Sequence, residues 1–248
     1  MGLTAKLVLK TLETGLVPER LTRTWVRYLC SQAIDRASLG DVEARHAVFR
    51  QINKELKMGA CLRRDPNTEA GDTEMGPEFF ELFLGKRLNF GCCYFPTGAE
   101  DLDEAEDTML WMSADRAHIR DGMQILEIGC GWGAMTFWLA AQFPQAQITA
   151  IAESTSRAIH LQKRLKELEL NNVKVIAAEF NDLKFTAEFD RIICLERFDL
   201  ISATPGWDTR LKGWLKPDGR FFLQHLVHSG CAYYQDSVGL EDMPGNAV

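Results

Sequence analysis

The chain has 248 residues, a formal net charge of −7 at pH 7 and a pI near 5.3. Binding to nucleic acid through bulk electrostatics needs a basic surface, so this charge predicts no nucleic-acid partner. Hydrophobic residues make up 46% and charged residues 25% of the chain, as in a soluble globular protein with one core and an appended region. Seven cysteines without regular spacing predict reduced thiols, and the lack of a cysteine–histidine cluster predicts no metal site.

Residues 1–61 are expected to form an N-terminal helical region. Leucines recur at near-helical spacing from Leu3 to Leu16, and a second helix is expected from Pro18, with arginines on its polar side: Arg20, Arg23 and Arg27. A basic amphipathic helix can make peripheral contact with a membrane. In the simpler interpretation, the helix packs on its own core and the arginines are solvated. Lys6 and Lys10 interrupt any secretory pattern, so the expected location is cytoplasmic.

Residues 62–115 are expected to be a linker and a cap that lead into the core. The stretch from Arg63 to Asp72 carries charges and turn formers with almost no apolar residues. An apolar cluster at 79–84 follows, then the stretch Phe90-Gly91-Cys92-Cys93-Tyr94-Phe95, and then an acidic helix predicted at 101–117.

Residues 116–230 are expected to form the core. Strands are predicted at 125–128, 147–152, 173–177, 191–195 and 220–226, alternating with helices at 134–143, 156–169 and around 208–215. This alternation predicts an α/β fold with a mostly parallel, Rossmann-like sheet covered on both faces. Residues 231–248 show no strand pattern and are expected to form a frayed tail.

A glycine-rich stretch after the first of these strands, Ile125-Leu126-Glu127-Ile128-Gly129-Cys130-Gly131-Trp132-Gly133, predicts a ligand site. Glycines let the backbone turn sharply and let a ligand come close, and the following helix presents N–H groups. The spacing also fits the loose dinucleotide pattern. Glu127 favours another cofactor, because its carboxylate would repel a pyrophosphate and pair with the ammonium of a methionine group. The run Glu-x-Gly-x-Gly-x-Gly resembles the first motif of S-adenosylmethionine-dependent methyltransferases.

A narrower resemblance comes from several islands in the same order: Phe90–Phe95, the glycine loop, Cys194–Asp199 and Phe222–His228. They resemble the cyclopropane-fatty-acid-synthase superfamily of methyltransferases, and most of all its coclaurine-type N-methyltransferases. The resemblance implies a class I methyltransferase sheet. Such a sheet usually closes with a C-terminal hairpin, which we expect to be missing here. Strand 220–226 would then be an open edge unless the tail or a second subunit of a homodimer covers it.

The resemblance also implies the cofactor-binding residues. Glu127 and the loop residues Gly129, Cys130, Gly131 and Gly133 would hold the methionine part. Phe90-Gly91 stands where the family has Tyr-Ser, whose hydroxyls help to bind the cofactor carboxylate, so that contact would be weaker here or come from backbone. Glu153 beside Ser154 is expected at the ribose hydroxyls, and Glu179 at the adenine amino group, with Phe180 as a stacking face. For both acids, ordinary solvation in a loop is the alternative.

The catalytic island departs most from the family, whose pattern resembles Ile-Glu-Leu-Phe-Glu-His-Met. This chain has Leu195-Glu196-Arg197-Phe198-Asp199-Leu200-Ile201, so a leucine replaces the histidine. The expected catalytic residues are Glu196, which would also touch the cofactor, Asp199 and His225. A carboxylate can orient an ammonium group and a histidine can remove its proton. Alternatively, His225 is a satisfied core residue.

Three functions remain open from the sequence. The first is a methyltransferase that uses S-adenosylmethionine to N-methylate a small amine, such as a tetrahydroisoquinoline. The second is a lipid-modifying enzyme of the cyclopropane type, favoured if the N-terminal helices bind membranes. The third is a cofactor-binding protein without catalysis, suggested by Leu200 and by the short C-terminal end.

Overall fold

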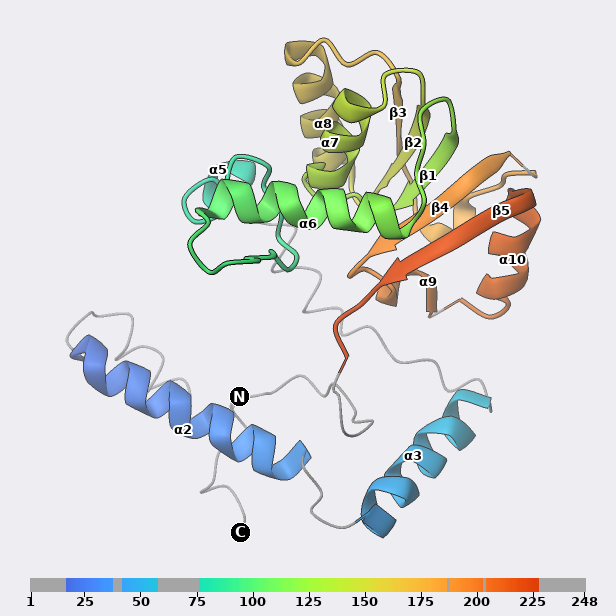
Figure 1. Cartoon of the computed structure of the whole chain (residues 1–248). Helices are drawn as coiled ribbons and strands as arrows, with labels where there is room; N and C mark the ends of the chain where they lie inside the picture. The colour runs from blue at the N-terminus through green and yellow to red at the C-terminus, as the bar shows by residue number, and fades with distance from the viewer. Residues whose placement is uncertain (1–16, 38–41, 58–75, 187, 203, 228–248) are drawn as a thin grey trace. The chain divides into compact units, whose positions relative to one another are not determined.

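A computed structural model describes residues 17–37, 42–57, 76–186, 188–202 and 204–227 (Figure 1). The chain divides into two compact units, residues 1–60 with 227–248 and residues 61–226. In the first unit, α2 (Glu19–Ala37) begins directly after Pro18, and α3 (Val42–Lys57) follows it. None of the described helices is both long and apolar enough to cross a bilayer. The helix predicted at residues 3–16 lies outside the described residues.

The second unit contains a five-stranded sheet in the order β3-β2-β1-β4-β5, and every pairing in it is parallel. The strands are β1 (Gln124–Ile128), β2 (Gln147–Ala152), β3 (Val173–Ala177), β4 (Phe189–Leu195) and β5 (Leu215–Gln224). The chain order reverses beside β1, which lies between β2 and β4. Ligands of open α/β sheets bind at the carboxyl ends of the strands at such a point.

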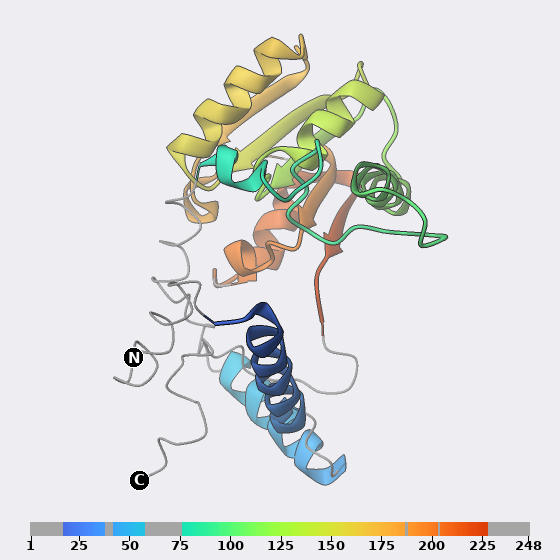
Figure 2. The ribbon, with the colours of Figure 1, turned by 90° about the vertical axis from the view of Figure 1, so that its left-hand side faces the viewer.

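Helices cover both faces of the sheet, as Figure 2 shows. One face packs against α6 (Leu102–Arg116), α7 (Ala134–Gln142) and α8 (Thr155–Glu167), and the other against α9 (Asp199–Ser202) and α10 (Trp207–Trp214). Side chains alternate between the faces along each strand, because successive residues of a strand point to opposite sides. In β1, Ile125 joins the α6–α7 side and Leu126 joins the α9–α10 side. The prediction of a parallel sheet covered on both faces is confirmed.

The remaining elements follow from local signals. Asp101 caps α6 through a capping box: its side chain accepts from the Glu104 backbone, and the Glu104 side chain accepts from the Asp101 backbone. A short helix, α5 (Pro77–Phe80), begins the apolar cluster at 79–84, and a 3-10 turn, η1 (Phe180–Asp182), follows β3.

The last strand differs from its prediction. Pairing with β4 begins at Leu215, opposite Phe189, and resumes at Arg220, opposite Arg191. Residues 216–219, which precede the strand predicted at 220–226, therefore form a bulge within β5. Among the described strands β5 lies at an edge of the sheet. The missing hairpin, the tail at 231–248 and the proposed domain boundaries remain predictions.

Candidate functional site

The glycine loop joins β1 to α7 through three residues with positive φ, Gly129 (77°), Gly131 (54°) and Gly133 (92°). This left-handed conformation strains any residue with a side chain. A β-carbon at Gly131 would meet no other part of the protein within 4 Å, whereas one at Gly133 would lie 2.5 Å from the Phe137 ring. Gly133 therefore allows close packing, and Gly131 faces open space that a ligand can fill.

Glu127 lies at the end of β1 with 3% of its surface exposed. Thr136, in the first turn of α7, donates its hydroxyl to Glu127 Oε2 at 2.5 Å. Burial, together with the nearby Glu153 carboxylate, raises the pKa of Glu127 to about 7, and the hydrogen bond from Thr136 opposes part of this shift. A cation beside Glu127 would favour its ionised form. The site thus suits an ammonium group.

Cys130 contributes backbone to the loop. Its side chain is 5% exposed and packs with Ala150 and Leu161, and burial raises the pKa of its thiol well above the ordinary value. The N–H groups of Gly129 and Cys130 both donate to the Ile151 carbonyl, at 3.2 and 3.1 Å. These bonds fix the loop to the neighbouring strand β2.

Glu153 follows β2 and meets two guanidinium groups. Arg157 Nη1 lies 2.6 Å from Glu153 Oε2, and Arg197 Nη1 lies 3.1 Å from Glu153 Oε1. Despite this ion pair, the buried Glu153 Oε1 accepts no hydrogen bond within the described structure. An acceptor in that state fits a hydroxyl donor such as ribose. Ser154 caps α8 by accepting from the Arg157 N–H at 3.2 Å.

Of the two residues after β3 that were expected at adenine, Glu179 is accessible and Phe180 is not. Glu179 is exposed at the start of η1. Phe180 is only 5% exposed; its ring packs 5.3 Å from that of Trp214, and the Arg210 guanidinium lies 5.2 Å from the ring centre. The expected stacking face is therefore not open to a ligand, because the core and an arginine already cover it.

Glu196 brings the stretch at residues 90–92 to the sheet. Its carboxylate Oε1 accepts from the Cys92 N–H at 3.1 Å and contacts the Gln224 amide at 3.5 Å. A β-carbon at Gly91 would lie 3.2 Å from the Glu196 carboxyl carbon, so the glycine lets the carboxylate rest on the backbone. Glu196 itself has a φ of +59°, a strained conformation that often marks a functional residue. Burial, with Glu196 beside it, raises the pKa of Cys92 to about 11.

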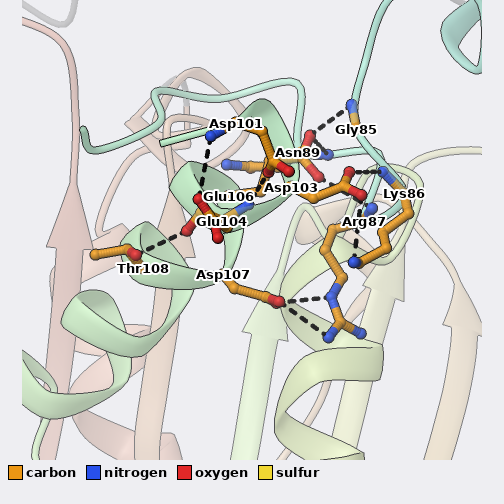
Figure 3. A network of polar contacts seen from close by, with 10 residues as sticks. All are labelled: Gly85, Lys86, Arg87, Asn89, Asp101, Asp103, Glu104, Glu106, Asp107 and Thr108. Atoms are coloured by element: carbon orange, nitrogen blue, oxygen red, sulfur yellow. Dashed lines mark hydrogen bonds and ion pairs between the residues drawn. The ribbon is translucent and has the colours of Figure 1, made fainter. Parts of the chain in front are cut away.

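A buried carboxylate on α6, Glu106, fixes the backbone of residues 85–89, which directly precede Phe90. Glu106, which is fully buried, accepts from the N–H groups of Gly85 (3.0 Å), Arg87 (3.0 Å) and Asn89 (3.2 Å), as Figure 3 shows. The next residue, Phe90, is 61% exposed and packs edge-on against Phe80. Sequence reasoning missed Glu106, whose only signal was the acidic character of its helix.

The remaining catalytic candidates lie near the end of β5 and the start of α9. Leu195 pairs with Gln224, so Glu196 and His225 follow the ends of neighbouring strands. His225 is exposed, with its ring 6.2 Å from that of Phe198, so it is not a core residue. Asp199 begins α9, and its side chain is not among the described ones. No group of three potential metal ligands occurs in the described part of the chain.

The fold and the glycine loop define an α/β domain of the methyltransferase type. Residues 64–239, more than half of the chain, match the family model described as mycolic acid cyclopropane synthetase. The chain belongs to this family.

Two sequence relatives represent its branches. The chain is 28% identical to (S)-coclaurine N-methyltransferase of Thalictrum flavum subsp. glaucum, over 95% of this chain and 65% of the relative. It is 26% identical to cyclopropane-fatty-acyl-phospholipid synthase of Escherichia coli (strain K12), over 63% of this chain and 39% of the relative. The chain thus spans less than two thirds of the length of either relative.

Solved structures give the same two branches. Coclaurine N-methyltransferase bound to N-methylheliamine and SAH matches with a TM-score of 0.79 and 27% identity, over 93% of this chain and 65% of that one. The cyclopropane synthase MmaA2 from Mycobacterium tuberculosis matches with a TM-score of 0.54 and 26% identity, over 60% of this chain and 53% of that one.

Proposed function

We propose that this chain binds S-adenosylmethionine and transfers its methyl group to a small amine. The observation that carries this proposal is the glycine loop itself: a β-carbon at Gly131 would meet nothing within 4 Å, and the buried carboxylate of Glu127 lies on the strand that leads into the loop. The similarity to coclaurine N-methyltransferase over most of the chain supports the choice of an amine acceptor.

Residues at the carboxyl ends of β1, β2 and β3 match most parts of this cofactor, although Phe180 offers no open face for stacking. Glu127 would pair with the ammonium of the methionine group, and the backbone of Gly129–Gly133 would line it. The Glu153 oxygen without a hydrogen bond would accept from ribose, and the exposed Glu179 would meet the adenine amino group. When bound, the cofactor supplies a methyl group on a positively charged sulfur. Phe90 offers no hydroxyl, and Gly91 offers only its backbone.

The acceptor amine would be positioned by Glu196 and His225. Methyl transfer is an in-line displacement, so the protein mainly aligns the two reactants. The amine needs a free lone pair; Glu196 would orient its ammonium form and His225 would remove the proton. Exposed aromatic rings near this edge would attract the cationic group: Phe90, Tyr94 and Phe95. Asp199 remains a candidate for the same task.

Lipid modification is the second candidate, favoured by the family description and by the similarity to the E. coli synthase. Labelled S-adenosylmethionine, incubated with a panel of amines and a panel of phospholipids, separates the two functions. Label in an amine supports our proposal; label only in phospholipid supports the second candidate. No transfer to either, with the cofactor bound, would favour a protein without catalysis.

Substitutions at the acceptor site test the assigned roles. Glu196→Gln and His225→Ala should each lower turnover of the accepted amine by at least ~10²-fold. Glu188→Gln serves as a control, because Glu188 is exposed and precedes β4, at the opposite end of that strand. Unchanged rates in the first two variants would remove these residues from the site.

The expected partners and location need separate measurements. Peripheral membrane contact through α2 predicts that the protein floats with anionic vesicles, and a homodimer predicts twice the chain mass in sedimentation. A cytoplasmic location likewise remains a prediction, which fractionation of the source cells tests.

A further inference from the structure

Two departures from the family pattern meet at one glycine. Arg197 stands where the family pattern has leucine, and Leu200 where it has histidine. A β-carbon at Gly129 would lie 2.8 Å from Arg197 Cβ and 2.7 Å from Leu200 Cδ1. Both side chains therefore lie directly over the first glycine of the loop.

Arg197 then continues across the end of β1. Arg197 follows β4, Gly129 follows β1 and Glu153 follows β2, and the sheet places β1 between the other two strands. Because the Arg197 guanidinium reaches Glu153 at 3.1 Å, its side chain must span the carboxyl end of β1. The two side chains are only 28% and 12% exposed, so solvent screens this ion pair less than one on the surface.

We propose that Arg197 sets the cofactor affinity by covering Gly129 and pairing with Glu153, so that the cofactor must displace it from both. This inference rests on the proposed function. The ribose hydroxyls and the guanidinium compete for the same carboxylate oxygen, and the arginine stem fills space over Gly129. Arg157, which pairs with the other oxygen, would stay in place and keep Glu153 oriented.

The loss of cofactor affinity caused by Arg197 depends on the fraction of molecules in which its side chain has left Gly129 and Glu153. If the side chain has left them in about a tenth of the molecules, the apparent affinity is roughly tenfold below the intrinsic one. Arg197→Leu restores the family residue and should tighten binding by about that factor. Arg197→Met keeps an unbranched stem but removes the charge, so a smaller gain there would separate the ion pair from the steric part.

Calorimetry of the whole chain with S-adenosylhomocysteine, and separately with adenosine, tests the proposal. Both ligands carry the ribose that competes with Arg197 for Glu153, and adenosine lacks the carboxylate, so Arg197→Leu should tighten the binding of both. Arg164→Leu is the matched control: Arg164 lies on α8 and pairs with Glu167 at the surface, and its loss should leave both affinities unchanged. Urea unfolding of each variant confirms that it is folded.

Each result is decisive. Equal or weaker binding of both ligands by Arg197→Leu and Arg197→Met would overturn the inference while wild-type binding upholds the proposed function. Loss of S-adenosylhomocysteine binding alone would overturn it too, since Arg197 would then contact the cofactor carboxylate. If neither the wild type nor any variant binds S-adenosylhomocysteine or adenosine, both the inference and the proposed cofactor site are wrong.

Discussion

Replacing Glu127 with glutamine should stabilise the protein while it weakens cofactor binding. Glu127 is 3% exposed and its described hydrogen bond comes from the Thr136 hydroxyl. An amide oxygen can still accept that bond, so Glu127→Gln keeps the packing and removes the charge. The variant therefore isolates the cost of an ionised carboxylate at the end of β1.

The pKa shift gives the magnitude. A rise from 4.5 to about 7 corresponds to about 3 kcal/mol. The folded protein holds the Glu127 proton more tightly than the unfolded chain does. The contribution of this group to stability is therefore fully present below pH ~4.5 and is lost as the pH rises through about 7. At pH 8, Glu127→Gln should raise the free energy of unfolding by up to about 3 kcal/mol. At pH 5 the gain should be below about 1 kcal/mol.

Urea unfolding of both proteins at pH 5 and pH 8 measures this difference. Calorimetry with S-adenosylhomocysteine at pH 8 should show weaker binding by the variant, because the amide cannot pair with an ammonium. A variant that is equally or less stable than the wild type at pH 8 would refute the reasoning. The site would then hold its charge without cost.

The other predictions concern the loops around the crevice. Glu106→Gln should lower the free energy of unfolding by roughly 1–3 kcal/mol in urea, because Oε2 accepts from the Arg87 N–H and the amide nitrogen in its place would leave that donor unpaired. Burial raises the pKa of Glu106, so removing the buried charge offsets part of this loss; a loss under about 0.5 kcal/mol, on the order of a surface change, would contradict the prediction. Gly131→Ala and Gly122→Ala both place alanine at positive φ in open space, so each should cost roughly 1 kcal/mol. Only Gly131→Ala should also weaken S-adenosylhomocysteine binding in calorimetry; equal affinities would place the ligand elsewhere. Gly133→Ala should cost more stability than either, since its β-carbon would collide with Phe137; a smaller loss in urea would show that the ring moves aside easily.

The order of elements in the core could be predicted because each signal is local. Apolar runs, glycines and caps lie within a few residues of the structure that they determine, and β2 and β3 begin and end where the pattern predicts. The bulge in β5 could not be predicted. It depends on how residues 216–219 pair across to β4, which is a tertiary constraint.

At the proposed cofactor site, too, the features set by local sequence could be predicted and those set by tertiary contacts could not. The positions of Glu127 and the glycines follow from their motif, but the pairing of Glu153 with Arg197 joins residues far apart in the sequence. The resemblance implied that Phe180 is a stacking face for adenine, yet Trp214 of α10 packs against its ring. Partners of this kind emerge only when the sheet brings its strand ends together.

A crystal of the protein soaked in S-adenosylhomocysteine tests the proposed cofactor site most directly. We expect the amino acid part of the ligand to lie against Gly129–Gly133 with its ammonium at Glu127, and its ribose at Glu153. Arg197 should be displaced from Glu153 in the same crystal. An Arg197 that still pairs with Glu153 at saturating ligand, or a ligand bound away from Gly131, would contradict this expectation.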